Sequence, residues 1–174
     1  MDIAMIGIGV GAAGLAIALF LYTQVQKIEI ENETVADITE QIQTGAMAFL
    51  NAEYKYLSIF IIIVAALLFF INDGEFETPA AFLAGAICSV AAGYSGMRSA
   101  TSANGRTAMA AASGGQSAAL EVSYNGGAVM GLSVGGLGLM GISLMAYWLG
   151  TGPEVQNIAG FGMGASSIAL FARV

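Results

Sequence analysis

The segment Tyr54–Ile71 reads YKYLSIFIIIVAALLFFI, and its only charge is Lys55 beside its first residue. About 20 helical residues cross a hydrocarbon core of ~30 Å. Backbone polar groups inside lipid must be paired within the segment, which favours a helix. The apolar residues are continuous and do not alternate with polar ones, as they would in a strand of a transmembrane barrel. The segment therefore predicts a transmembrane helix.

Four more segments of this kind occur along the chain. The five predicted spans lie near 3–23, 54–71, 79–97, 128–149 and 158–172. The first begins with Met1-Asp2 and has no basic residue before its apolar run, unlike a signal peptide, so we expect a retained helix. We expect an all-α fold: a polytopic membrane helix bundle of about five transmembrane helices that forms one transmembrane domain, 1–174.

Composition supports this class and excludes others. The 174 residues are 57% hydrophobic and 10% charged, whereas soluble domains carry about 25% charged residues. The net charge of −7 provides no basic patch for phosphates, so we expect no nucleic-acid partner. With one cysteine and no histidine, the chain can form no internal disulfide and is unsuited to zinc binding. Cys88 lies in an apolar stretch and is expected to be a small buried hydrophobic residue.

The charges predict an orientation in the membrane. In the five-span interpretation all cations fall on one side of the membrane, and the connections 72–78 and 150–157 on the other side contain acidic residues and no cation. The cations are Lys27, Lys55, Arg98, Arg106 and Arg173. Cationic loops remain in the cytoplasm, so we expect the amino terminus outside and the carboxyl end in the cytoplasm.

Capping signals set the expected helix ends. Thr34–Asp37 has the form of a capping box, which predicts a helix that runs unbroken from about Val35 to Ile71. Thr78-Pro79 is a suitable N-cap and first-turn pair for the third span, and Gly114-Gly115 is expected to end that helix. Three helices would then overshoot the bilayer on the cytoplasmic side, an arrangement that suits an aqueous site just above the membrane.

Glycines recur at four-residue spacing inside the spans. The repeats are Gly7 and Gly11; Gly127, Gly131 and Gly135; and Gly160 and Gly164. Small residues at this spacing allow helix backbones to approach closely in lipid, so we expect packing faces there. Gly9–Gly14 and Gly136–Gly141 also match the dinucleotide-binding fingerprint, but the chain lacks the strand–helix alternation of a Rossmann unit.

Several motifs together resemble a known family. They are 43–56 (QTGAMAFLNAEYKY), 81–86 (AFLAGA), 96–101 (GMRSAT), 103–108 (ANGRTA), 126–132 (GGAVMGL) and 160–174 (GFGMGASSIALFARV). In this order and spacing they resemble the amino-terminal portion of the membrane-bound, ion-translocating inorganic pyrophosphatases. Each motif alone is weak, because it consists mostly of small and apolar residues.

The resemblance implies a function. Members of the family have about sixteen helices, work as homodimers, and couple hydrolysis of magnesium pyrophosphate at the cytoplasmic face to outward transport of H⁺ or Na⁺, in some cases with K⁺. The resemblance places the Mg²⁺ ligands and hydrolytic residues beyond Val174. We therefore expect no catalytic or metal-binding residue in this chain and no pyrophosphate hydrolysis by the chain alone. The partners implied are the lipid bilayer of a prokaryotic cell membrane and the remaining helices of the pump.

The resemblance also indicates two site residues. It implies that Arg173 faces the ion path near a gate, and Ser166 lies two turns earlier on the same helix face. The competing interpretations are a lipid-anchoring arginine for Arg173 and a helix-packing residue for Ser166. Arg98 and Arg106 are expected to be surface charges that set topology, or to pack against further helices.

Two other functions stay open at this point. One is a small non-enzymatic multi-span membrane protein, such as a transporter subunit or assembly partner. The other is a proteolipid-type ring subunit, which needs an essential carboxylate near mid-membrane. Glu121 is the candidate for that carboxylate, although it and Glu53 lie at the cytoplasmic ends of their spans.

Overall fold

The computed structural model describes residues 3–149 and 157–171, and these residues form helices and connecting turns with no strand. The helices are α1 (Ile3–Gln26), α2 (Glu33–Ile71), α3 (Glu77–Leu149) and α4 (Ala159–Phe171). The predicted all-α class is confirmed. Gly9–Gly14, which matches the dinucleotide fingerprint, lies inside α1, so the Rossmann interpretation is excluded for this segment.

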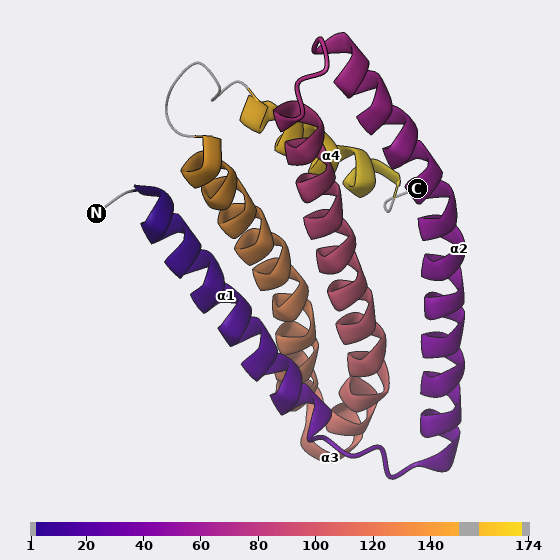
Figure 1. Cartoon of the computed structure of the whole chain (residues 1–174). Coiled ribbons are helices and arrows are strands. Elements are labelled where there is room, and N and C mark those ends of the chain that lie inside the picture. Colours follow the sequence, from indigo (N-terminus) through magenta and orange to yellow (C-terminus); the bar gives the residue numbers. More distant parts are fainter. Residues whose placement is uncertain (1–2, 150–156, 172–174) are drawn as a thin grey trace.

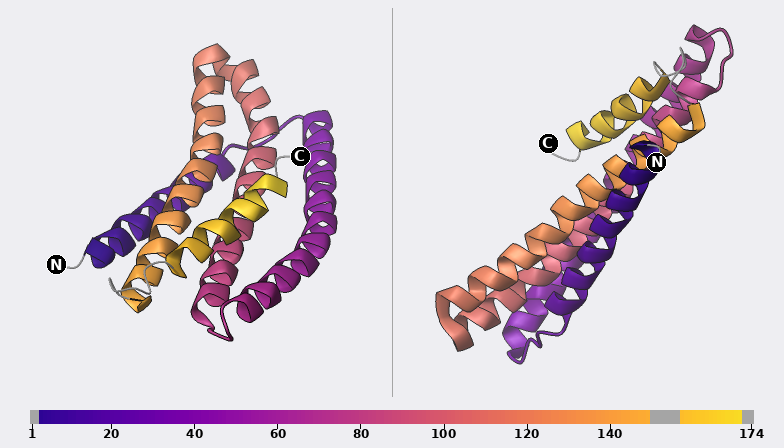
Figure 2. Two further views of the ribbon diagram at one scale, coloured as in Figure 1. Left: turned by 90° about the horizontal axis from the view of Figure 1, so that it is seen from above. Right: turned by 90° about the vertical axis from the view of Figure 1, so that its left-hand side faces the viewer.

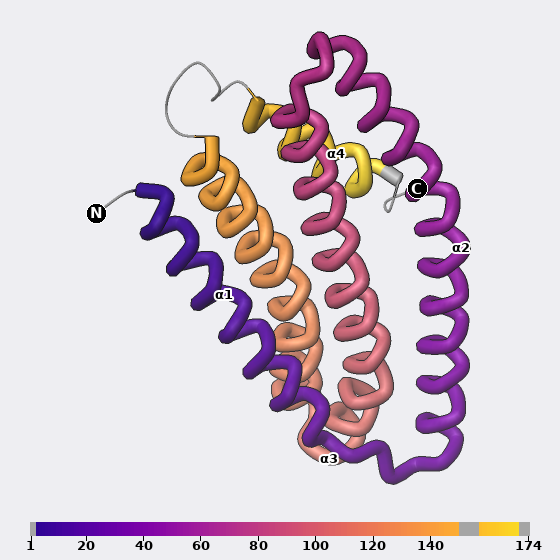
Figure 3. The backbone as a smooth tube through the Cα atoms, in the orientation of Figure 1, coloured from indigo at the N-terminus to yellow at the C-terminus, as the bar shows by residue number. Residues whose placement is uncertain are grey.

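A sharp break divides α3 into two limbs, 77–114 and 116–149. Gly115 has φ 72° and ψ −165°, which is outside the helical region and is a conformation that side chains with a Cβ rarely adopt. The limbs run antiparallel on either side of this glycine (Figure 3). The helix end predicted at Gly114-Gly115 is therefore confirmed.

The helices lie side by side around α3. The second limb packs along α1, and the first limb contacts α2, while α4 crosses the first limb at the end opposite Gly115 (Figure 1; Figure 2). One buried cluster joins the end of α1 to both limbs near the break and contains Val25, Ala103 and Val122. A second cluster of Leu57, Ala86 and Ile168 joins α2, α3 and α4.

The apolar side chains mostly point outward. In the most apolar windows of α1 and α2 only 11% and 6% of the residues are buried. Large apolar side chains such as Ile62 and Phe70 are 66% and 76% exposed. Water would oppose such a surface and lipid accommodates it, so the bundle is that of a membrane protein.

Three helices, α1, α2 and α3, are long and apolar enough to span a membrane. Four of the five predicted spans lie on α1, α2 and the two limbs of α3. The fifth falls on α4, whose 13 residues are fewer than the about 20 that a crossing needs. The number of crossings therefore stays a prediction.

Two expected helix starts are wrong. The N-cap of α2 is Asn32, whose Oδ1 accepts a hydrogen bond of 3.1 Å from the Val35 amide, so Thr34 lies inside the helix. Asparagine is at least as good an N-cap as threonine, and Asn32 has the extended backbone that this position needs. Likewise α3 begins at Glu77, and the Thr78 hydroxyl donates to Asn157 Oδ1 at 3.0 Å instead of capping.

Two of the three glycine repeats form packing faces. Gly7 and Gly11 lie against Ser143 and Gly136 of the second limb, and Gly160 and Gly164 lie against the start of α3. The repeat Gly127, Gly131 and Gly135 is different, because a Cβ on any of these glycines would meet no atom of the described residues within 4 Å. Within the described residues α1 contacts the neighbouring face at Gly136 instead, so the packing face predicted at this repeat stays a prediction.

Candidate functional site

A cavity of about 330 Å³ lies where α4 crosses α3, and it holds the predicted site residue Ser166. Its walls come from α2, both limbs of α3 and α4. Polar groups on these walls belong to Tyr54, Ser89 and Ser166, and apolar residues such as Met130 and Phe161 provide most of the remaining surface.

Close backbone contact fixes α4 at this crossing. A methyl group on Gly164 would overlap the Phe82 carbonyl oxygen, and one on Gly85 would overlap the Phe161 carbonyl oxygen. The Ser89 hydroxyl also donates a hydrogen bond of 3.1 Å to the Ala165 carbonyl oxygen. Glycines at both helix surfaces therefore hold Ser166 at a defined place beside the cavity.

The few polar groups on the cavity walls are uncharged. Ser89 lies near the middle of the predicted span 79–97, and Ser166 is exposed, with no hydrogen-bond partner for its hydroxyl among the described residues. The Tyr54 hydroxyl donates to the Val90 carbonyl oxygen at 3.2 Å. Such hydroxyl groups can coordinate a passing ion or hydrogen-bond to a water molecule, but they carry no charge that could neutralise a phosphate.

Two residues expected from the sequence bear on this cavity, Cys88 and Arg173. Cys88 was expected to be buried, but it is half-buried, because its thiol forms part of the cavity wall rather than of a packed interior. Arg173 lies outside the described residues. The structure therefore places Ser166 and does not test whether it shares a path with Arg173.

A polar network that the sequence did not predict lies nearer the break in α3. Arg106 donates from Nη2 to Gln26 Oε1 and from Nη1 to the Ser102 carbonyl oxygen, both at 2.7 Å. Gln26 Nε2 donates in turn to the Ser102 hydroxyl at 2.9 Å. Arg106 is half-buried, and its Nε is buried without a partner among the described residues, so the expectation of a surface charge is wrong. The polar residue Gln26 at the end of the apolar α1 was the sequence feature that could have indicated this network.

Acidic groups form no metal site in the part of the chain that the structure describes. No three Asp, Glu, His or Cys side chains there are close enough to hold a metal ion. Glu121 is exposed at the start of the second limb, before the predicted span 128–149, and is not at mid-membrane. This position does not fit the essential carboxylate of a proteolipid ring.

Comparison with known proteins gives consistent matches. The family model described as inorganic H⁺ pyrophosphatase matches residues 12–174. A candidate K⁺-stimulated pyrophosphate-energized sodium pump of Clostridium tetani is 51% identical over 144 residues, which are 82% of this chain and 20% of that protein. A K⁺-insensitive pyrophosphate-energized proton pump of Methanosarcina mazei is 40% identical over 142 residues, or 82% of this chain and 21% of that protein.

A third relative is a K⁺-stimulated pyrophosphate-energized sodium pump of Thermotoga maritima. It is 36% identical over 162 residues, which cover 82% of this chain and 22% of that protein. The chain thus spans about a fifth of the length of each of these relatives.

Proposed function

The chain belongs to the inorganic H⁺ pyrophosphatase family, and from this premise we propose that it forms part of a pump that couples pyrophosphate hydrolysis to outward transport of H⁺ or Na⁺. The observation that carries the proposal is the match of the family model over residues 12–174. Relatives that are named as sodium pumps and as proton pumps both match, so the proposal covers both ions. The lipid-facing surfaces of α1 and α2 agree with a role inside the membrane.

Within such a pump this chain supplies membrane helices rather than hydrolytic groups. Pyrophosphate hydrolysis in the family relies on Mg²⁺, which neutralises phosphate charge and activates water. The described residues do not fit such a metal, because no three Asp, Glu, His or Cys side chains among them lie close enough together to bind it. We therefore assign the Mg²⁺ site, and any K⁺ site, to parts of a longer protein, as we do its further helices and its assembly as a homodimer.

Ser166 is our candidate for the ion path, with Arg173 as its partner at the gate. Three features support Ser166: it lines the cavity, its hydroxyl is exposed, and close glycine contacts hold its helix. The matched control is Ser167, whose hydroxyl already donates to the Met163 carbonyl oxygen at 2.8 Å. Ser166→Ala is expected to slow ion transport several-fold at unchanged protein level, while Ser167→Ala leaves it unchanged. Equal transport rates for the two variants would remove Ser166 from the path.

Inside-out membrane vesicles test the pump itself. The vesicles come from cells that express the whole open reading frame containing this chain, and they are compared with vesicles that carry residues 1–174 alone. The first set is expected to show Mg²⁺-dependent pyrophosphate hydrolysis and pyrophosphate-driven uptake of H⁺ or Na⁺, and the second set neither. Hydrolysis no higher than in vesicles from cells without the gene would overturn the proposal and favour a non-enzymatic multi-span protein.

A further inference from the structure

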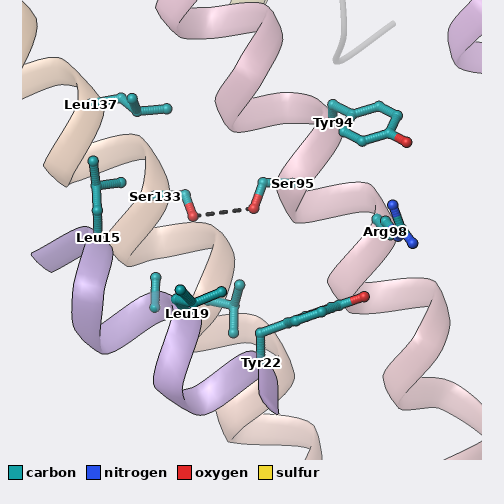
Figure 4. A pocket seen from close by; sticks show the side chains of 10 residues that line it. Leu15, Leu19, Tyr22, Tyr94, Ser95, Arg98, Ser133 and Leu137 are labelled. Carbon is teal, nitrogen blue, oxygen red and sulfur yellow. Dashed lines mark hydrogen bonds between the residues drawn. The ribbon is translucent and has the colours of Figure 1, made fainter. Parts of the chain in front are cut away.

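A second cavity, of about 430 Å³, lies between α1 and the two limbs of α3 (Figure 4). One part of its wall is apolar and includes Leu15, Leu19 and Leu137. At the other end the side chains of Tyr22 and Arg98 come together. The cavity is thus amphipathic along its length, with an apolar part and a cationic end.

Two tyrosines frame the cation. The Arg98 side chain lies between the side chains of Tyr22 and Tyr94 (Figure 4). None of the residues that line the cavity is acidic, and no acidic side chain of the described residues forms an ion pair with Arg98. Arg98 is exposed. The cationic end of the cavity therefore has free capacity for an anion.

The depth of this end matches the surface of a bilayer. Tyr22 lies at the end of the predicted span 3–23, and Arg98 directly follows the predicted span 79–97. Tyrosine and arginine gather at membrane–water interfaces, where their polar ends reach the headgroups. The apolar part of the cavity then extends from the headgroup level toward the hydrocarbon core.

We propose that this cavity binds one anionic phospholipid, with the phosphate at Arg98 and the two tyrosine hydroxyls and an acyl chain along Leu15 and Leu19. Leu19 is 64% exposed, so the apolar part opens sideways to the membrane. A phospholipid carries its charge and its apolar chain in the same order as the cavity wall. The proposal needs the membrane location and does not depend on the pump activity.

The other occupant to consider is a helix from outside the described residues that carries an acidic side chain. The apolar wall favours the lipid, because it continues from Arg98 along Leu19 and Leu15 and opens sideways, so that an acyl chain joined to the phosphate can lie there. A phosphodiester and a carboxylate each present two charged oxygens, so the donors at Arg98 can bind either group. Arginine is also suited to phosphate, which it can contact with two parallel hydrogen bonds.

Native mass spectrometry of the purified chain with phosphatidylglycerol and phosphatidylcholine gives the first test. The first phosphatidylglycerol is expected to bind more tightly than phosphatidylcholine, and Arg98→Gln is expected to weaken it about tenfold or more, as loss of a hydrogen bond to a charged group implies. Tyr22→Phe should weaken it less. Lys27→Gln removes an equal charge from an exposed residue at the same end and should have no effect. Equal effects of Arg98→Gln and Lys27→Gln, or no effect of either, would overturn the proposal.

A photo-crosslinking amino acid at position 19 separates the two occupants in the protein's own membrane. A lipid site yields phospholipid adducts that are enriched in anionic lipid relative to those at Ile62, an exposed position on α2. A peptide adduct at position 19 would show that a helix fills the cavity and would overturn the proposal. Absence of an adduct at position 19 while Ile62 reacts with lipid, or the same lipid composition at both positions, would also overturn it.

Discussion

A hydrogen bond of 2.7 Å joins Arg106 Nη2 to Gln26 Oε1, although the two residues are eighty positions apart in the chain. The amide nitrogen of Gln26 donates onward to Ser102, so both ends of this side chain are used. No acidic side chain of the described residues forms an ion pair with Arg106. The amide and a backbone carbonyl therefore stabilise a half-buried charge and tie the end of α1 to the first limb of α3.

Gln26→Leu is expected to destabilise the fold. Leucine has a similar volume, but it leaves the Arg106 donor buried without a partner, which costs about 1–3 kcal/mol. Thermal unfolding in detergent measures the change. Gln41→Leu is the matched control, because the Gln41 amide donates only to Asp37 on an exposed face of α2, at 2.9 Å. We expect a change within about 0.5 kcal/mol for the control.

The Arg106→Met variant tests whether Gln26 contributes to stability as the hydrogen-bond partner of the Arg106 charge. If Gln26 serves mainly to satisfy Arg106, the double variant with Gln26→Leu should lose less stability than the sum of the single variants. The expected coupling is on the order of 0.5–3 kcal/mol, as for residues in one network. Strict additivity would show that the bond between the two side chains contributes nothing to stability.

Two adjacent glycines are predicted to behave in opposite ways. A Cβ on Gly136 would lie 2.9 Å from the Gly11 carbonyl oxygen, so Gly136→Ala should push α1 away from α3 and cost about 1–3 kcal/mol. A Cβ on Gly135 meets no described atom within 4 Å. Gly135→Ala should therefore be neutral, or stabilising by up to about 1 kcal/mol through the helix preference of alanine.

Thermal unfolding in detergent compares the stability of the Gly135→Ala and Gly136→Ala variants. If Gly135→Ala proves as destabilising as Gly136→Ala, α1 does not pack on the face that contains Gly136, and the arrangement of α1 against the second limb is wrong.

The crossing of α4 over α3 can be followed at the single cysteine of the chain, Cys88. Gly164→Ala should displace α4, because its methyl group would overlap the Phe82 carbonyl oxygen. Cys88 lines the cavity beside α4, so its labelling by a maleimide should become several-fold faster. Gly162→Ala is the control on the same helix, since a Cβ there meets no described atom within 4 Å, and it should leave labelling unchanged. Equal labelling rates for both variants would contradict the crossing.

Features of single helices were predictable from the sequence. Continuous apolar runs gave the long helices, and the paired glycines Gly114-Gly115 marked the break, because glycine tolerates the positive φ that the chain adopts there. The ordered motifs led to the family that the comparisons support. Ser166 was singled out by its spacing to Arg173 and lines the cavity at the α4 crossing, while its place on an ion path stays a prediction.

Features that depend on which helix faces meet were not predictable. The repeat Gly127, Gly131 and Gly135 has the spacing of a packing face, yet the neighbouring Gly136 meets α1. Spacing shows that a face can pack, and the position of the partner decides whether it does. The same reason explains the half-buried Arg106, because its burial requires Gln26 of a helix eighty residues away.

The orientation of the chain in the membrane gives a final prediction. Lys27, Arg98 and Arg106 all lie on the side of the break in α3, and the turn between α2 and α3 carries acids, so the break should be cytoplasmic. In a Cys88→Ser background, Glu75→Cys in that turn should react with a membrane-impermeant maleimide in intact cells. Ser113→Cys, exposed next to the break, should react only after permeabilisation. The reverse pattern would place the amino terminus inside, and it would also move the proposed lipid site to the outer leaflet, because Arg98 lies on the same side as Ser113.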